Sequence, residues 1–308
     1  MQSKLLPNAA FGLIPATFTP FLDSGEVDFA TIPAMVDQLI ARGVAGLYVN
    51  GTTGEGPSLT TPERKELAEA FVTAVAGRIP VIVQVGHNSL SEARDLAAHA
   101  QSAGANAVSA TPPGYFRAES VSALTEVVAE IAAGAPALPF FYYHIPAFGG
   151  VALDMASLAE SAFGRVPNFR GIKFSSPNLH EFDRCRRAVN GQLEVFFGVD
   201  EMLLAGLSMG AFGAVGSTYN FAPGLYLELI DAFRQGDIAR ARNLQSQSVD
   251  MIEILISSCG RAGLKAAMTL SGIPCGRHRL PIHDPTLEQL KNMEERLGQA
   301  GFLKWIKR

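Results

Sequence analysis

Residue 173 is a lysine within a short apolar segment, residues 169–174 (FRGIKF), which is predicted to form a buried strand. We expect the other lysines, Lys265 included, to contact water at the termini or on helices. Burial of an ammonium lowers its pKa and leaves a nucleophilic amine at neutral pH. Such an amine beside a tyrosine suits Schiff-base chemistry on a carbonyl compound. A lysine that reaches solvent at the strand end, or pairs with a buried acid, would fit the same sequence.

A glycine-rich turn, residues 50–56 (NGTTGEG), follows another predicted strand. Its glycines free the backbone, and the hydroxyls of Thr52 and Thr53 with the adjacent N–H groups suit a small carboxylate or phosphate. An ordinary strand-to-helix turn in which one threonine caps the helix explains the residues equally well. The turn is not a nucleotide-binding P-loop, because no Gly-Lys-Ser/Thr follows.

Three further side chains have two interpretations each. Tyr143, at the end of an apolar segment, is either a general acid/base or a core aromatic with a satisfied hydroxyl. Asp200 and Glu201 are either ligands or caps that the helix dipole favours. The six histidines form no H-x-H or H-E-x-x-H set, so no catalytic metal is predicted.

The elements that would position these residues repeat one local pattern, in which a helix ends at a glycine and a short apolar strand follows. The pattern occurs at 41–51, 102–112 and 208–218. Gly43, Gly104 and Gly210 suit the left-handed position that ends a helix. The strands are continuous apolar segments, which is typical of a parallel sheet buried on both faces.

Five more strands are predicted, at 12–18, 80–85, 138–143, 170–174 and 193–197. Helices are predicted near 28–42, 61–77, 89–103, 120–133, 154–163, 178–190, 200–209 and 223–235. The helix at 61–77 has a strong start, with Thr61 as N-cap and Pro62 as first helical residue. The count predicts an α/β fold: a (β/α)₈ TIM barrel at 1–235 with a C-terminal helical region at 236–308.

The alternative fold is an open doubly wound sheet, which would carry a glycine-rich turn after its first strand. The segment TPFLDSGEVD, residues 19–28, follows the first strand and is no such turn. In a barrel, catalytic groups lie at the carboxyl ends of the strands. Hydroxyls, the lysine and the two acids are therefore expected to converge on one face.

The composition excludes several classes of protein. The net charge of −4 gives no electrostatic case for binding nucleic acid or a membrane surface. The three cysteines have no ligand-like spacing and indicate a reducing compartment. Residues 1–16 are too short and too interrupted by proline for a signal peptide, and no apolar segment of about 18 residues could span a membrane. A cytoplasmic protein is expected.

Five motifs together resemble one known family. GTTGE, YYHIP, GIKF, FGVDEMLLAG and GAVGSTYN occur in the order and spacing of the dihydrodipicolinate synthase / N-acetylneuraminate lyase superfamily. The resemblance extends from about residue 10 to 300. It implies a (β/α)₈ barrel with a C-terminal helical appendage, a homo-oligomer that is usually a tetramer, and a class I aldolase that uses pyruvate and needs no metal or other cofactor.

The resemblance also implies a role for each matching residue. Lys173 would form the Schiff base with the keto carbon, and Tyr143 would relay the proton of the substrate hydroxyl. Thr52 and Thr53 would hold the pyruvate carboxylate. The polyhydroxyl part of a sugar acid would contact Ser175, Gly198, Asp200, Glu201 and Ser217. Tyr115 would lie near a subunit interface.

The choice within the superfamily depends on residue 148. The segments YYHIPAF, FGVDE and GAVGSTYN resemble the branch that cleaves sialic acid to N-acetylmannosamine and pyruvate. The synthases carry an arginine where this chain has Phe148, so the carboxylate clamp for their second substrate is absent at this position. This difference favours a lyase.

One segment departs from the lyases, which usually continue with an acidic turn after Ser175. This chain has Ser176, Pro177 and Asn178 there. A synthase or a 2-keto-3-deoxy sugar acid aldolase is therefore the alternative. A non-catalytic sugar-acid-binding protein on the same fold is a third hypothesis, and turnover of any 2-keto acid would distinguish it.

Overall fold

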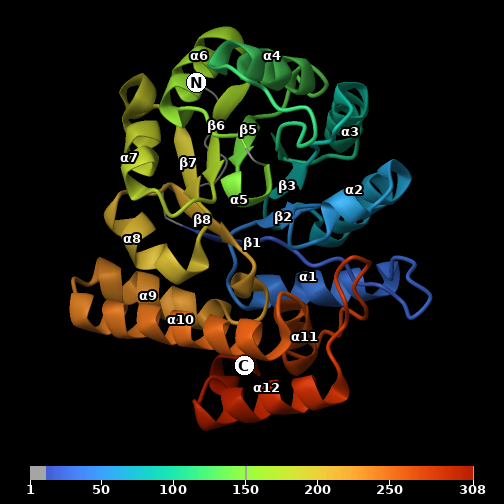
Figure 1. Ribbon diagram of the computed structural model, residues 1–308, viewed down its shortest axis with the longest axis vertical. Coiled ribbons are helices and arrows are strands. Elements are labelled where there is room, and N and C mark those ends of the chain that lie inside the picture. Colours follow the sequence, from blue (N-terminus) through green and yellow to red (C-terminus); the bar gives the residue numbers. More distant parts are fainter. Residues whose placement is uncertain (1–11, 150, 308) are drawn as a thin grey trace.

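The predicted strands are all present, and they form one parallel sheet that closes into a barrel (Figure 1). The computed structural model describes residues 12–149 and 151–307, so most of the segment assessed for a signal peptide lies outside the described residues. The strands are β1 (Leu13–Pro15), β2 (Leu47–Val49), β3 (Val81–Gln84), β4 (Ala107–Ala110), β5 (Phe140–His144), β6 (Phe169–Phe174), β7 (Glu194–Phe197) and β8 (Gly213–Gly216). β1 pairs with β8, and the sheet closes where Ala16 bridges to Tyr48 of β2. The TIM-barrel prediction is confirmed.

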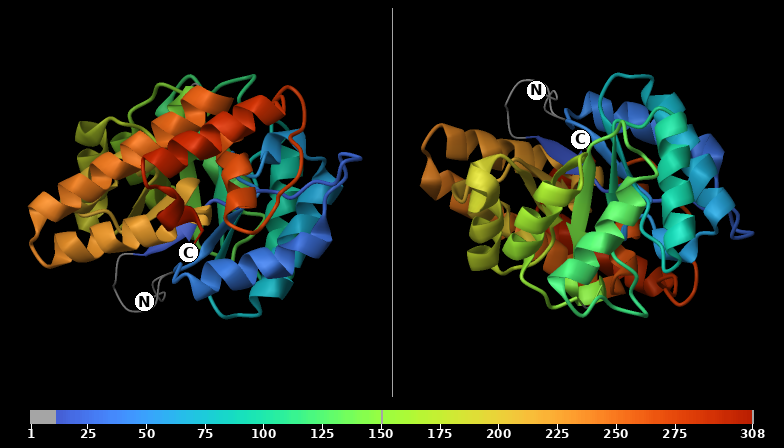
Figure 2. Two further views of the ribbon diagram at one scale, coloured as in Figure 1. Left: turned by 90° about the horizontal axis from the view of Figure 1, so that it is seen from below. Right: turned by 90° about the horizontal axis from the view of Figure 1, so that it is seen from above.

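A helix follows each strand and packs on the outside of the barrel (Figures 1 and 2). These helices are α1 (Ile32–Ala41), α2 (Thr61–Val75), α3 (Leu90–Ser102), α4 (Val121–Ala132), α6 (Met155–Arg165), α7 (Leu179–Arg187), α8 (Leu203–Ser208) and α9 (Pro223–Arg234). Short helical turns also occur, namely η1 (Phe29–Thr31), η2 (Gly56–Ser58), α5 (Pro146–Gly149), η3 (Ala188–Gly191), η4 (Asp200–Met202) and η5 (Thr218–Asn220). Three of these turns, α5, η4 and η5, directly follow a strand, where they shape the mouth of the barrel.

The boundaries differ from the predicted ones for local reasons. Thr61 is not the N-cap of α2: Thr60 holds that position in a capping box with Glu63. The helix predicted at 178–190 ends at Arg187, because Val189 and Asn190 adopt left-handed φ values of 51° and 55°. The helix predicted at 200–209 begins as the 3₁₀ turn η4.

The glycine prediction holds for all three repeats of the pattern. Gly43, Gly104 and Gly210 have φ values of +80°, +89° and +79° and follow α1, α3 and α8. Left-handed backbone costs little at glycine, so each residue turns the chain from a helix into the next strand without strain.

Alternate residues of the strands face two separate cores. Every second residue of a strand points into the barrel, and these side chains form the inner core. Its members are Ile14, Ala16, Tyr48, Ile82, Ala107, Phe141, Tyr143, Phe196 and Val215. The intervening residues, such as Ile172 and Phe174 of β6, belong to the core between the sheet and its helices. Lys173 lies between these two outward residues, so the period of β6 turns its side chain into the barrel.

The C-terminal region consists of helices that lie together at one side of the barrel, orange to red in Figures 1 and 2. They are α10 (Ile238–Cys259), α11 (Ala262–Leu270), α12 (Leu287–Gln299) and α13 (Leu303–Ile306), and residues 236–307 contain no strand. Tyr226 of α9 shares a hydrogen bond of 2.8 Å with Ser248 of α10, so the barrel and the appendage are joined through a buried contact. The division at 235/236 remains a prediction. In the described residues, no helix has the length and apolarity that a membrane span needs.

Candidate active site

A cavity of about 230 Å³ opens at the carboxyl ends of the strands. Its wall contains all the predicted catalytic and substrate-binding residues: Thr52, Thr53, Tyr143, Lys173, Ser175, Gly198, Asp200, Glu201 and Ser217. Residues that are up to 165 positions apart in the chain therefore meet in one place, as the barrel topology requires. Tyr115 is not part of this wall. Its side chain is 82% exposed and packs edge-on against Phe116, with ring centroids 5.0 Å apart.

Lys173 is enclosed in the wall of the cavity and is only 4% exposed. Its Nζ lies 3.4 Å from the ring centroid of Tyr143, which is its register partner on β5, and 3.4 Å from Ser175 Oγ. Burial lowers the pKa of Lys173, while Tyr143 and the more distant Asp200 oppose that shift. The lysine does not reach bulk solvent, and a hydroxyl and an aromatic ring are its direct contacts.

Two pairs of hydroxyl groups connect β5 and β8 to the turn after β2. Tyr143 Oη lies 3.3 Å from Thr52 Oγ1, and Thr53 Oγ1 lies 2.6 Å from Ser217 Oγ. The Tyr143 ring packs edge-on against Tyr48, with centroids 5.7 Å apart. The ring is thus fixed inside the barrel while its hydroxyl faces the cavity.

The turn that carries the two threonines is fixed by its backbone and by neighbouring side chains. Asn50 has a left-handed φ of 61° and donates from its side chain to the Arg64 carbonyl oxygen at 2.8 Å. A Cβ atom on Gly56 would lie 2.0 Å from the Asn50 carbonyl oxygen, so only glycine fits there. Neither Thr52 nor Thr53 caps a helix, because α2 begins at its own capping box. The two threonines line the cavity instead, where their hydroxyls pair with Tyr143 and Ser217.

Gly198, directly after β7, and Gly216, at the end of β8, allow polar groups of the cavity wall to approach closely. A Cβ on Gly198 would lie 2.1 Å from Ser175 Oγ, and one on Gly216 would lie 1.8 Å from Asp200 Oδ1. Asp200 is buried, and its carboxylate accepts hydrogen bonds from Thr218 N and Oγ1 at 2.9 and 2.6 Å. Burial raises the pKa of Asp200, and the Thr218 hydrogen bonds oppose that rise.

Asp200 and Glu201 both lie in the first turn of η4, where the helix dipole favours an acid. Neither carboxylate caps η4, which has no side-chain cap hydrogen bond. Glu201 is exposed at the mouth of the cavity. Within residues 12–149 and 151–307, no group of three His, Cys, Asp or Glu side chains is placed to hold a metal ion.

The segment that departs from the lyases lies outside the cavity wall. Asn178 caps α7, and its side chain accepts a hydrogen bond of 3.2 Å from Glu181 N. Ser176 is buried, and its hydroxyl accepts a hydrogen bond of 3.2 Å from Asn178 N. Within the wall, only Ser175 comes from this turn, so Ser176, Pro177 and Asn178 shape the start of α7.

No pattern in the sequence indicated that the C-terminal helices contribute to the site. Ile252 and Ile256 of α10, with Arg261 and Leu264 at α11, complete the cavity wall. Arg261 donates from Nη2 to the Thr52 carbonyl oxygen at 3.3 Å, and its guanidinium lies 4.9 Å from the Phe148 ring. A guanidinium therefore stands beside residue 148, although residue 148 itself is apolar.

The prediction for Lys265 was wrong. Its side chain is 2% exposed and pairs with Glu55, with Nζ 2.9 Å from Oε1. The available signal was the apolar helical context of Lys265, AGLKAAM, together with an acid in the GTTGEG turn. Lys265 and Glu55 are far apart in the sequence, so their contact depends on tertiary packing. Neither sequence signal specifies that packing.

Comparison with known proteins identifies the family. The family model described as the dihydrodipicolinate synthetase family matches residues 9–300. The chain belongs to the dihydrodipicolinate synthetase family. The predicted resemblance is therefore confirmed over almost the whole chain.

Members of the dihydrodipicolinate synthetase family differ in how similar they are to this chain. N-acetylneuraminate lyase from Rattus norvegicus is 40% identical over 297 residues, covering 95% of this chain and 93% of its own length. The solved Proteus mirabilis N-acetylneuraminate lyase is 40% identical, with a TM-score of 0.92 and coverage of 96% of this chain and 100% of that one. The solved dihydrodipicolinate synthase from Aquifex aeolicus is 28% identical, with a TM-score of 0.86 and coverage of 97% and 100%.

Proposed function

We propose that this protein is a class I, Schiff-base-forming pyruvate aldolase that cleaves N-acetylneuraminate to N-acetylmannosamine and pyruvate. The observation that carries the proposal is the enclosed Lys173, whose amine touches Tyr143 inside a cavity lined with hydroxyl groups. The 40% identity to N-acetylneuraminate lyases supports the choice of substrate.

The reaction begins at Lys173. Its neutral amine attacks the C2 carbonyl carbon of the open-chain sugar acid, and loss of water gives an iminium. Tyr143 then relays the proton of the C4 hydroxyl, with Thr52 as its hydroxyl neighbour at 3.3 Å. The C3–C4 bond breaks, its electron pair enters the C2–C3 bond of an enamine, and N-acetylmannosamine leaves as the aldehyde. A proton returns to C3, and water releases pyruvate and restores the amine.

The remaining wall residues bind the two ends of the substrate. Thr52 and Thr53 hold the carboxylate of the pyruvate unit through their hydroxyls and the backbone N–H groups of the glycine-rich turn. Ser175, Gly198, Asp200, Glu201 and Ser217 contact the polyhydroxyl end. The position of Thr52 supports this division, because its hydroxyl lies 3.3 Å from Tyr143 Oη. Thr53 Oγ1 lies 2.6 Å from Ser217 Oγ, so the two ends of the substrate would meet at that pair.

The nature of residue 148 argues against a synthase. Phe148 lies in the cavity wall and offers no donor to the carboxylate of a second substrate. The synthase from Aquifex aeolicus is also less similar to this chain, at 28% identity, than the lyases from Rattus norvegicus and Proteus mirabilis, which are each 40% identical. Both observations favour a neutral sugar aldehyde as the partner of pyruvate.

A substrate panel tests this proposal. Pyruvate release from N-acetylneuraminate and from 2-keto-3-deoxygluconate is measured by coupled oxidation of a reduced nicotinamide. A separate arm measures the consumption of pyruvate in the presence of aspartate semialdehyde. We expect kcat/KM to be highest for N-acetylneuraminate. A higher value for the deoxygluconate would move the assignment to a sugar-acid aldolase, and turnover of none would indicate a binding protein.

The assembly and location belong to the same proposal. A homotetramer in the cytoplasm is expected, with Tyr115 at a subunit interface. The exposed ring pair of Tyr115 and Phe116, at 82% and 84% exposure, supports an interface there. Light scattering of the eluted protein measures the mass directly, and a monomeric mass would overturn the interface.

A further inference from the structure

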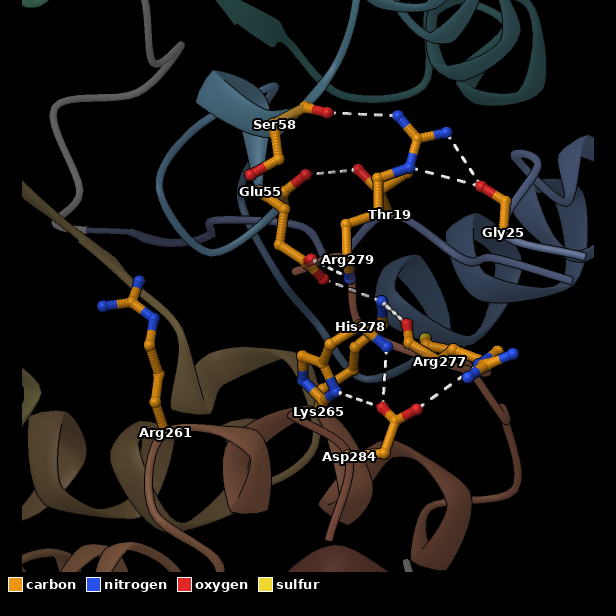
Figure 3. Close-up of polar contacts among 12 residues, drawn as sticks. Thr19, Gly25, Glu55, Ser58, Arg261, Lys265, Arg277, His278, Arg279 and Asp284 are labelled. Carbon is orange, nitrogen blue, oxygen red and sulfur yellow. Dashed lines mark hydrogen bonds and ion pairs between the residues drawn. The ribbon is translucent and has the colours of Figure 1, made fainter. Parts of the chain in front are cut away.

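A second buried lysine lies next to the active site and takes no part in the proposed chemistry. Lys265 of α11 pairs with Glu55 of the glycine-rich turn at 2.9 Å, and both side chains are at most 3% exposed (Figure 3). The two residues are 210 positions apart in the sequence. The pair therefore ties the C-terminal helices to the turn that carries Thr52 and Thr53.

Each charged group of this pair has additional hydrogen-bond partners. The other carboxylate oxygen of Glu55 accepts from Arg279 N at 2.9 Å, and Lys265 Nζ donates to the Arg277 carbonyl oxygen at 2.5 Å (Figure 3). Lys265 Nζ also lies 4.3 Å from the centroid of the Phe21 ring. Burial lowers the pKa of Lys265, and Glu55 opposes that shift. The geometry holds the ammonium in one place.

The acidic residue of the pair has an unfavourable backbone conformation. Glu55 has a left-handed φ of 56°, which non-glycine residues adopt only when their surroundings enforce it. Its neighbour Gly54 is held as well, because Thr19 Oγ1 donates to the Gly54 carbonyl oxygen at 2.6 Å. The ion pair thus holds Glu55 in a left-handed backbone conformation that it would otherwise leave.

The start of α11 contacts the same turn at a second point. Arg261 is four residues before Lys265, and this spacing places both side chains on one side of α11. Arg261 donates to the Thr52 carbonyl oxygen at 3.3 Å, whereas Lys265 binds Glu55. The segment from Thr52 to Glu55 is therefore held at both ends by one short helix.

Stability alone is a weak reason for such a pair. Replacing a buried ion pair by apolar groups of similar size is often neutral for stability or increases it, because two charges need not lose their water. A fixed position for the turn is a better reason, since the hydroxyls of Thr52 and Thr53 point from it into the cavity.

We propose that Lys265 is a positioning residue: through Glu55 it holds Thr52 and Thr53 in the arrangement that binds the carboxylate of the substrate. The inference rests on the proposed function, because it assigns to the pair the geometry of the carboxylate subsite. Loss of the pair should weaken binding of carboxylate-bearing ketones and leave the reactivity of Lys173 unchanged. Loss of one charge-assisted hydrogen bond to the carboxylate weakens binding by about 10-fold or more.

The test compares two ketones that react with the same lysine. Pyruvate carries a carboxylate and hydroxyacetone does not, and borohydride reduction traps each as an adduct on Lys173. In Lys265→Met, and in the double variant Lys265→Met/Glu55→Gln, we expect the half-saturating pyruvate concentration for trapping to rise about 10-fold or more. The value for hydroxyacetone and the kcat at saturating N-acetylneuraminate should stay near those of the native enzyme.

A matched control comes from the opposite end of the same barrel. Arg170 at the start of β6 pairs with Glu194 at the start of β7 at 2.9 Å, and Glu194 is buried. Arg170→Met removes a comparable ion pair far from the cavity. The half-saturating pyruvate concentration of this variant should equal that of the native enzyme, even if its melting temperature changes. Glu55→Gln, which keeps the shape of the side chain, serves if Lys265→Met does not fold.

Three results would overturn the inference. The first is an unchanged pyruvate half-saturation in both the Lys265→Met and the Glu55→Gln variants. The second is an equal rise for pyruvate and hydroxyacetone, which is the signature of general loosening. The third is the same pyruvate effect in Arg170→Met. In each case, a trapped adduct on Lys173 of the native protein still supports the proposed function. If the native protein forms no adduct, both the proposed function and the role of Lys265 are wrong.

Discussion

At the scale of the residue, the proposed reaction depends on the uncharged form of Lys173. Burial disfavours the ammonium, so the pKa of Lys173 lies below its ordinary value of 10.5. The folded protein therefore binds fewer protons than the unfolded chain between that lowered pKa and 10.5. Stability should rise with pH across this window, because the unfolded state gives up its extra proton there.

Lys173→Met should abolish turnover and raise stability at pH 7. The thioether chain fills similar space and removes an amine whose burial costs about 1–3 kcal/mol. The difference in unfolding free energy between variant and native protein should shrink as the pH rises toward 10.5. Urea titrations at several pH values measure it. A difference that grows with pH would show that the folded state prefers the charged lysine.

Residue 148 should control the choice of aldehyde. Phe148→Arg adds a donor beside Arg261, and a charge-assisted hydrogen bond of about 1.5–3 kcal/mol shifts relative preference about 10- to 150-fold. We expect kcat/KM to rise for condensation of pyruvate with aspartate semialdehyde and to fall for cleavage of N-acetylneuraminate. Phe148→Leu is the control, since it changes shape without adding charge. Equal efficiency of the native enzyme in both reactions would contradict the lyase assignment.

At the scale of the element, close approach between strands sets the shape of the cavity. Gly198→Ala should reduce kcat/KM by about 100-fold, because the new Cβ would lie 2.1 Å from Ser175 Oγ and displace a hydroxyl that touches Lys173. Gly164 on α6 gives the control: a Cβ there meets nothing within 4 Å. Gly164→Ala should leave kinetics unchanged and stabilise the helix by up to about 1 kcal/mol. Equal kinetics for the two variants would show that Ser175 is not constrained by residue 198.

The sequence was sufficient to predict the helices and strands, because the signals for them are local. Apolar strands, glycines after helices and the period of two predict the barrel and direct Lys173 inward. Boundaries failed where a competing local bond decided them, as at Thr60, whose hydroxyl accepts from Glu63 N. The contribution of the C-terminal helices to the cavity was not predicted, for another reason. Burial of Lys265 and the position of Arg261 depend on packing between distant segments, which no local pattern encodes.

At the scale of the whole molecule, the barrel brings the amine of Lys173 and its hydroxyl neighbours together in one cavity. The iminium that we propose on Lys173 would itself be the electron sink for C–C cleavage. We therefore expect activity to survive prolonged EDTA treatment, measured as pyruvate release before and after dialysis. Loss of activity that zinc or magnesium restores would indicate a metal-assisted mechanism instead.

The most direct test of the central claim is the position of the covalent intermediate. The protein is incubated with pyruvate, reduced with sodium borohydride, digested and mapped by mass spectrometry. We expect a three-carbon adduct on the peptide that contains Lys173, and no such adduct in Lys173→Ala. An adduct on the other buried lysine, Lys265, or no adduct at all, would contradict this claim.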